Sequence, residues 1–278
     1  AACLTNEGYV EDVQDTARIQ NPPAKTVMIP TTAGTGAEAT PNAIFLFPEQ
    51  NLKVGIVSDS FVASYVILDG KMTESLPARL TASTGIDALC HAVESYISIL
   101  ANPLSRLFSR AAVEKICANI ERAWADGSDL EARQNMLEGA FLAGVCLTSS
   151  STVAVHALSY PLGGKYHIPH GVSNAVLLAA VMKVNLPDCR EAFTELAPLM
   201  LPDCGNLPKE SWPEAVVAYM GDLCRRLGIP DSLKTFGIEP EALEELTDNA
   251  MEVKRLLLKN PRKLTREEIS GIYEGLLR

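Results

Sequence analysis

The histidines of this 278-residue chain lie in one stretch instead of being scattered along it. They occupy positions 91, 156, 167 and 170. His91 follows Asp87 by four positions, so on a helix the two side chains would share a face, one turn apart. Such a pair alone says little, because an exposed acid–histidine pair on a helix has the same spacing. The clustering of the other histidines makes Asp87 and His91 candidates for metal binding.

His156 and His170 form a second pair, with thirteen residues between them. His156 lies in a run whose composition suits a helix. The proline and glycines of residues 161–164 are expected to break this run, and Pro169 is expected to start a new helix just before His170. Histidines on consecutive helices could then turn inward to one point. With the Asp–His pair they would offer one carboxylate oxygen and three imidazole nitrogens, a ligand set for a divalent transition metal.

These segments resemble the iron-containing (group III) alcohol dehydrogenases, in which an Asp-x3-His and a His-x13-His segment hold the metal. The resemblance implies that the metal ligands are Asp87, His91, His156 and His170. It extends over nearly the whole chain. The other segments that carry it are the Thr-rich segment Ile29–Glu38, the segment Leu227–Pro230, and Asn260-Pro261-Arg262 with Thr265.

The hydrophobic pattern changes near residues 72–78. Before this point, short runs rich in β-branched and aromatic residues predict strands, at residues 26–29, 43–47, 53–57 and 65–68. After Pro77, nearly every segment has the period of a helix. We therefore expect a partial α/β cofactor-binding domain in residues 1–74 and a larger all-α domain, with the metal and catalytic site, in residues 75–278. The resemblance implies a dehydroquinate synthase-like architecture.

The chain starts with what reads as the tail of a helix, Ala1–Leu4. By comparison with the resembled family, we expect the glycine-rich phosphate loop, and the helix that it opens, to be missing from this sequence. A helix N-terminus with free backbone N–H groups normally binds the pyrophosphate of a dinucleotide. The sequence therefore predicts weak or no binding of a nicotinamide cofactor by this polypeptide alone.

Cofactor contacts are assigned by the resemblance to Thr32, Thr35 and Lys53. From the pattern alone, residues 31–36 would be a polar turn after a strand. The sequence does not distinguish NAD from NADP. The acidic residue that usually does so lies early in a dinucleotide-binding fold, in the part that we expect to be missing here.

Tyr160 stands four residues after His156, where many members of the resembled family have a proton-relaying histidine. On a helix its ring should face the same cleft, which makes it a candidate catalytic residue that hydrogen-bonds the substrate or an imidazole nitrogen. A phenol is nevertheless a poor proton relay near neutral pH. The alternative is a core tyrosine with a satisfied hydroxyl. His167 could take part of the relay role, although a loop histidine is the simpler interpretation.

The implied reaction is hydride transfer between a small alcohol or aldehyde and NAD or NADP, with the metal as Lewis acid on the substrate oxygen. Three imidazoles and a carboxylate suit both Fe(II) and Zn(II), so the sequence leaves the metal open, as it does the substrate. Cys90 is adjacent to His91 in sequence but should point away from the site on a helix.

Composition excludes several classes of function. The formal net charge of −10 argues against binding to the phosphates of nucleic acids. No apolar run is long enough for a membrane span, and no export signal is visible at the N-terminus. The seven cysteines include no Cys-x-x-Cys pair, which indicates free thiols in a reducing compartment. We expect a cytoplasmic protein that forms a homo-oligomer, namely a dimer.

Three alternatives stay open. A glycerol-dehydrogenase-like or dehydroquinate-synthase-like zinc enzyme would share the architecture but use a different ligand set. A truncated helical fragment could bind metal without catalysis. A metallohydrolase is disfavoured, because the chain has no His-Glu-x-x-His segment.

Overall fold

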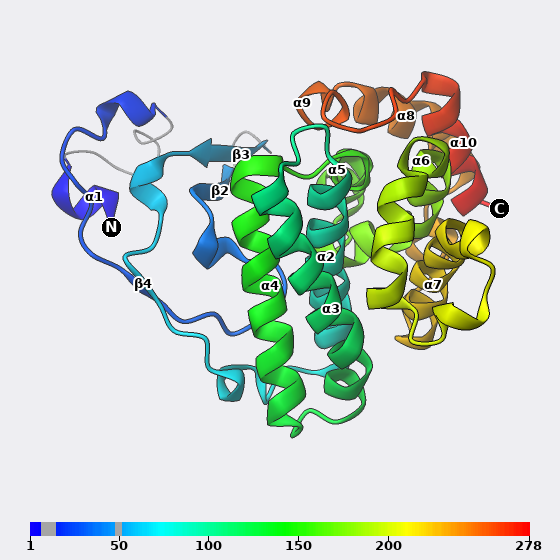
Figure 1. The fold of residues 1–278 in the computed structure, drawn as a ribbon. Helices are drawn as coiled ribbons and strands as arrows, with labels where there is room; N and C mark the ends of the chain where they lie inside the picture. Colours follow the sequence, from blue (N-terminus) through cyan, green and yellow to red (C-terminus); the bar gives the residue numbers. More distant parts are fainter. Residues whose placement is uncertain (7–14, 48–51) are drawn as a thin grey trace.

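The computed structural model describes residues 1–6, 15–47 and 52–278. Figure 1 shows a small N-terminal part of strands and loops beside a larger helical part. The N-terminal part contains α1 (Ala2–Thr5), β1 (Val27–Met28), β2 (Asn42–Phe47), β3 (Leu52–Val57) and β4 (Tyr65–Val66). This architecture confirms the expected fold class, an α/β remnant followed by a mostly helical domain.

The helical part begins with α2, directly after Pro77. Its helices are α2 (Ala78–Ile97), α3 (Pro103–Ala125), α4 (Leu130–Ser150), α5 (Ala154–Tyr166), α6 (His170–Met200), α7 (Trp212–Arg226), α8 (Leu243–Met251), α9 (Lys254–Leu257) and α10 (Arg266–Leu276). The 3-10 helices are η2 (Thr16–Arg18), η3 (Ala37–Ala39), η5 (Asp59–Phe61), η6 (Gly70–Thr73), η7 (Cys204–Asn206), η8 (Lys209–Ser211), η9 (Leu233–Phe236) and η10 (Pro240–Ala242).

The strands lie where the sequence predicts them, but they form two separate pairs. β1 pairs with β4 in parallel, and β2 pairs with β3 antiparallel. Parallel strands are normally covered on both faces by helices. Val27, Met28 and Tyr65 are instead exposed in the part of the chain that the structure describes. The β1–β4 pair is therefore an incomplete parallel sheet.

Helix α2 runs through the centre of the helical part (Figure 1). From Thr81 to Ile97 every side chain except that of Thr84 is buried. The helix packs against α3, α4, α5 and α6. A helix surrounded in this way consists mainly of small and apolar residues. Its few buried charged side chains must find partners on the neighbouring helices, because an unpaired buried charge is very unfavourable.

The predicted break at residues 161–164 is wrong. Helix α5 continues through this proline and both glycines to Tyr166. It ends at His167, whose backbone adopts the left-handed conformation with φ of 54°. The proline is buried, so packing in the helical core outweighs the low helix propensity of these residues. The second histidine pair still lies on consecutive helices, but the break that separates them is at residues 167–169.

Helix α10 is hydrogen-bonded to α5. Thr265 and Glu268 form a capping box at the start of α10. Further along this helix, the buried hydroxyl of Tyr273 donates a hydrogen bond of 2.6 Å to the carbonyl of Leu158. This bond fixes α10 against the helix that carries His156.

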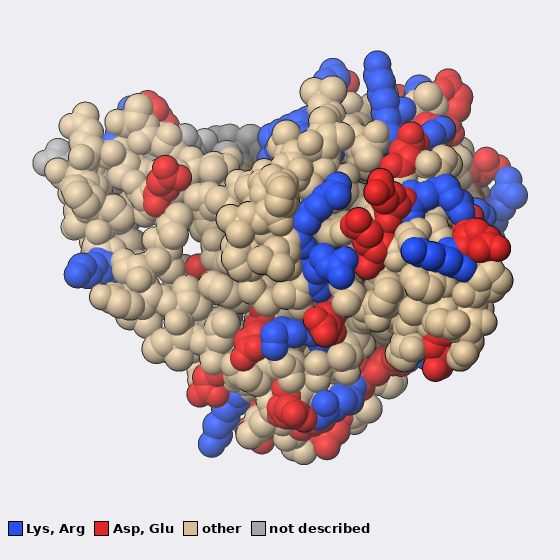
Figure 2. Space-filling view, in the orientation of Figure 1, with Lys and Arg blue, Asp and Glu red and all other residues tan. Residues whose placement is uncertain are grey.

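Charges on the helical part are mixed in sign. On the face shown in Figure 2, acidic and basic side chains are interspersed over the helices, whereas the N-terminal part carries few of either. Several charged side chains of the helical part form ion pairs, such as Arg226 with Glu121 and Arg266 with Glu244. Within the described ranges no single helix has the length and hydropathy of a membrane span; α4 and α5 meet these criteria only together, across a bend of 104°.

Candidate metal centre

Three helices bring the four predicted ligands to one point. Asp87 and His91 lie on α2, His156 lies in the first turn of α5, and His170 is the first residue of α6. One donor atom from each lies within 4.8 Å of all the others. The distances from Oδ1 of Asp87 to the Nε2 atoms are 3.8 Å for His91, 3.7 Å for His156 and 3.7 Å for His170.

Close backbone packing places His170 in this cluster. A Cβ atom on Gly171 would lie 2.3 Å from the carbonyl oxygen of Ser83 and 3.4 Å from Cβ of Asp87. Only glycine allows so short an approach between the start of α6 and α2. The glycine after His170 therefore sets its distance from the carboxylate of Asp87.

Glu94 is part of the site, although the sequence analysis does not name it as a candidate. Its side chain is fully buried; one oxygen accepts a hydrogen bond of 2.7 Å from the backbone N–H of Val155, and the other bonds to Nδ1 of His156. The N-cap residue of α5 is Val153, whose side chain makes no capping hydrogen bond. Glu94 replaces that cap from another helix. The spacing of residues could have identified Glu94 as a site residue, because it follows Asp87 by seven positions and so lies on the same helical face.

The electrostatics of the cluster favour a positive charge. Burial disfavours the charged form of Asp87, but the surrounding imidazoles hold its pKa well below its usual range. Burial lowers the pKa of His91 to about 4, against the attraction of Asp87. Burial also acts to lower the pKa of His156, but the charges of Glu94 and Asp87 raise it to about 9. Two buried carboxylates thus draw a proton or another cation to this point.

The donor set fits a divalent metal ion. Imidazole nitrogens and a carboxylate oxygen are ligands of Zn(II) and Fe(II), and here they converge in a buried place. Nδ1 of His91 is buried and has no hydrogen-bond partner among the described residues, so its ring is not held by a structural hydrogen bond at that atom. The side chain of His170 is 44% exposed and marks the open side of the cluster.

The Thr-rich segment is anchored beside this cluster. A Cβ on Gly36 would lie 2.6 Å from the carbonyl oxygen of Ala140 in α4, and a Cβ on Gly34 would lie 2.8 Å from Cβ of Thr84 in α2. Gly36 also has a positive φ of 58°, which favours glycine. The segment therefore rests on α2 one turn before Asp87.

The two threonines predicted to contact the cofactor differ in how exposed their side chains are. Thr32 is half-buried, and Thr35 is exposed with its hydroxyl accepting from the backbone of Ala37. Lys53 lies in β3, but its side chain is outside the described residues. Glu38, which the sequence reasoning did not single out, is buried in the same segment, and burial raises its pKa.

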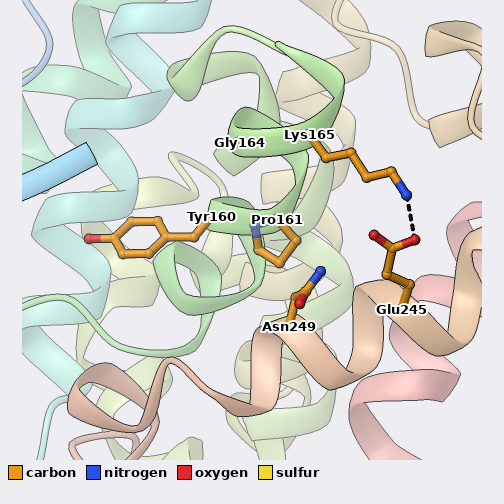
Figure 3. Close-up of a pocket in the computed structure, with 6 residues that line it drawn as sticks. All are labelled: Tyr160, Pro161, Gly164, Lys165, Glu245 and Asn249. Atoms are coloured by element: carbon orange, nitrogen blue, oxygen red, sulfur yellow. Dashed lines mark hydrogen bonds and ion pairs between the residues drawn. The ribbon is translucent and has the colours of Figure 1, made fainter. Parts of the chain in front are cut away.

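The remaining candidates lie outside the donor cluster. Tyr160 is 44% exposed and lines a cavity of about 470 Å³ with Lys165 and Glu245, which form an ion pair (Figure 3). No described residue hydrogen-bonds its hydroxyl, so it is not a satisfied core tyrosine. His167 is an exposed residue at the end of α5. Cys90 is buried, and burial raises the pKa of its thiol well above the ordinary value.

Known proteins resemble this chain over nearly its full length. The profile described as Fe-containing alcohol dehydrogenase family, C-terminal, matches residues 81–277, and the profile described as iron-containing alcohol dehydrogenase matches residues 1–70. Long-chain-alcohol dehydrogenase 1 of Geobacillus thermodenitrificans is 37% identical over 99% of this chain and 70% of its own length. 1,3-Propanediol dehydrogenase of Klebsiella pneumoniae is 36% identical over 97% of this chain and 69% of its own length.

Solved structures agree with these matches. The crystal structure of a 1,3-propanediol oxidoreductase superposes with a TM-score of 0.91 at 34% identity, covering 99% of this chain and 72% of its own. Sulfoacetaldehyde reductase from Bifidobacterium kashiwanohense, solved in complex with NAD+, gives a TM-score of 0.87 at 29% identity and covers 99% of this chain and 70% of its own. This chain therefore spans about 70% of the length of such relatives. By sequence, fold and the match over both of its parts, it belongs to the Fe-containing alcohol dehydrogenase family.

Proposed function

We propose that this chain forms the metal site and most of the catalytic cleft of a metal-dependent alcohol dehydrogenase. The enzyme transfers a hydride between a small alcohol or aldehyde and a nicotinamide cofactor. The supporting observation is the convergence of four donor groups in one buried place, within a chain of this family.

In this proposal Asp87, His91, His156 and His170 hold Fe(II) or Zn(II). A metal ion bound there supplies Lewis acidity toward the substrate oxygen. Glu94 retains the proton on Nδ1 of His156, which leaves Nε2 of that ring to face the other donors. Because His170 is the exposed member of the set, the substrate approaches from its side.

The cofactor, NAD or NADP, is proposed to contact Thr32, Thr35 and Lys53. The segment that carries both threonines rests on α2 one turn before Asp87, so a nicotinamide held there lies next to the metal site. The relative from Bifidobacterium kashiwanohense was solved with NAD+, which supports a nicotinamide cofactor for this chain.

Tyr160 is proposed to contact the substrate through its hydroxyl, which points away from the other residues that line the cavity in Figure 3. The Tyr160→Phe variant should raise KM with little change in thermal stability, because no described residue loses a hydrogen bond. An unchanged KM would place Tyr160 outside the substrate site.

We further propose a boundary between the two parts near residues 74 and 75, a homodimer, and no nucleic-acid partner. The net charge of −10 and the mixed surface charges support the last point. Analytical ultracentrifugation tests the dimer.

Activity is tested by loading the protein with Fe(II) or Zn(II) and following NADH consumption with short aldehydes. The assay is run on this chain and on a chain extended by the N-terminal segment of the relatives. Aldehyde-dependent turnover by the metal-loaded extended chain, abolished in its Asp87→Ala variant, is expected. Metal binding without turnover by either chain would instead favour the helical metal-binding module.

A further inference from the structure

Asn174 places its amide nitrogen among the candidate metal ligands. It lies on α6, four residues after His170, and its side chain is fully buried. Its Nδ2 atom is 2.7 Å from Oδ1 of Asp87, 3.1 Å from Nε2 of His156 and 3.2 Å from Nε2 of His170. The amide nitrogen therefore stands at the point toward which three of the four donors face.

The other end of the same carboxamide has no partner. Oδ1 of Asn174 is buried and accepts no hydrogen bond among the described residues. A buried carbonyl oxygen without a donor is unfavourable, and such atoms are rare in folded proteins. The present orientation is explained by Asp87, because a carboxylate only accepts hydrogen bonds and so requires the N–H side of the amide.

A metal ion would reverse this preference. The ion and the N–H groups of Asn174 both carry positive charge, so they compete for the same carboxylate oxygen and imidazole lone pairs. A carboxamide that faces a cation presents its oxygen, as amide oxygens do in metal sites. Turning the amide end for end exchanges the two atoms without moving the helix.

We propose that the carboxamide of Asn174 turns when the ion enters and that its Oδ1 becomes an additional oxygen donor beside the four predicted ligands. This inference rests on the proposed metal site. In the arrangement described above, the same side chain donates a hydrogen bond to Asp87.

The test compares metal affinities of chelator-stripped full chains by competition with a chromophoric chelator, using Zn(II) and Co(II). Asn174→Leu keeps the volume but has no oxygen, and its affinity should fall roughly tenfold or more. Asn174→Asp keeps an oxygen and adds charge, so it should bind the ion more tightly than the wild type. If the amide served only as a hydrogen-bond donor to Asp87, Asn174→Asp would instead bind more weakly.

Asn185→Leu is the matched control. Asn185 is buried in the same helix and exchanges hydrogen bonds with Asn260 away from the cluster, so its loss should lower stability without changing metal affinity. Visible absorption of the Co(II) proteins gives a second measurement, since losing a donor strengthens these bands. Unchanged affinity and bands in Asn174→Leu, or weaker binding by Asn174→Asp, overturn the inference. A wild type that binds no metal would instead refute the proposed metal site itself.

Discussion

Glu94 and His156 form a buried hydrogen bond between α2 and α5, across 62 positions of sequence. The same carboxylate accepts the backbone N–H of Val155. One side chain therefore fixes both the start of α5 and the orientation of the imidazole in its first turn. Such partners of a metal-binding imidazole set its tautomer and its basicity.

The Glu94→Gln variant should bind metal roughly 10- to 100-fold more weakly, because the neutral amide supports the ring of His156 less well. Competition with a chelator measures this change. Glu195→Gln is a suitable control, since Glu195 bonds to Tyr96 outside the donor cluster. Equal affinities for the wild type and Glu94→Gln would show that this hydrogen bond does not act on the metal.

The ion-free protein should lose stability as the pH rises. The pKa of His156 is raised from 6.5 to about 9 in the folded state, so its pairing with Glu94 contributes fully below pH 6.5 and is lost as the pH passes 9. Urea unfolding of chelator-treated protein at several pH values should show this decline. The Glu94→Gln variant should show a smaller decline over the same window; an identical slope in both proteins would contradict the assignment.

Removal of a predicted ligand should remove the metal. Asp87→Ala and His156→Ala each delete one donor from the cluster, and elemental analysis should find little bound metal in either protein. His167→Ala removes an exposed histidine that is not part of the cluster and should keep the wild-type content. Full metal content in both ligand variants would locate the metal elsewhere.

Two glycine substitutions should change stability in opposite directions. Gly171→Ala places a Cβ against the backbone of Ser83 and should lower the free energy of unfolding by about 1–3 kcal/mol, with weaker metal binding because His170 shifts. Gly164 lies within α5, and a Cβ there would meet no heavy atom within 4 Å apart from the neighbouring backbone of its own helix, so Gly164→Ala should raise the free energy of unfolding by about 0.5–1 kcal/mol. Urea denaturation of both variants checks the difference. A harmless Gly171→Ala would mean that α6 has room to move away from α2.

The sequence by itself determined the local features of this protein. The change from strand to helix patterns, the start of α2 after Pro77 and the capping box at Thr265 depend on residues close together in the chain. The pairing of Asp87 with His91 on one helical face is local in the same way.

Only the tertiary structure decided how these pieces meet. The continuation of α5 through Pro161, the capping of that helix by Glu94 and the position of Asn174 among the ligands all depend on packing between helices far apart in sequence. Glycine and proline disfavour a helix interior by roughly 1 and 3 kcal/mol, and burial in a packed core can outweigh such penalties. Contacts between distant segments leave no fixed spacing in the sequence. The metal-donor residues could therefore be named from the sequence, but the residues that hold these donors in place could not.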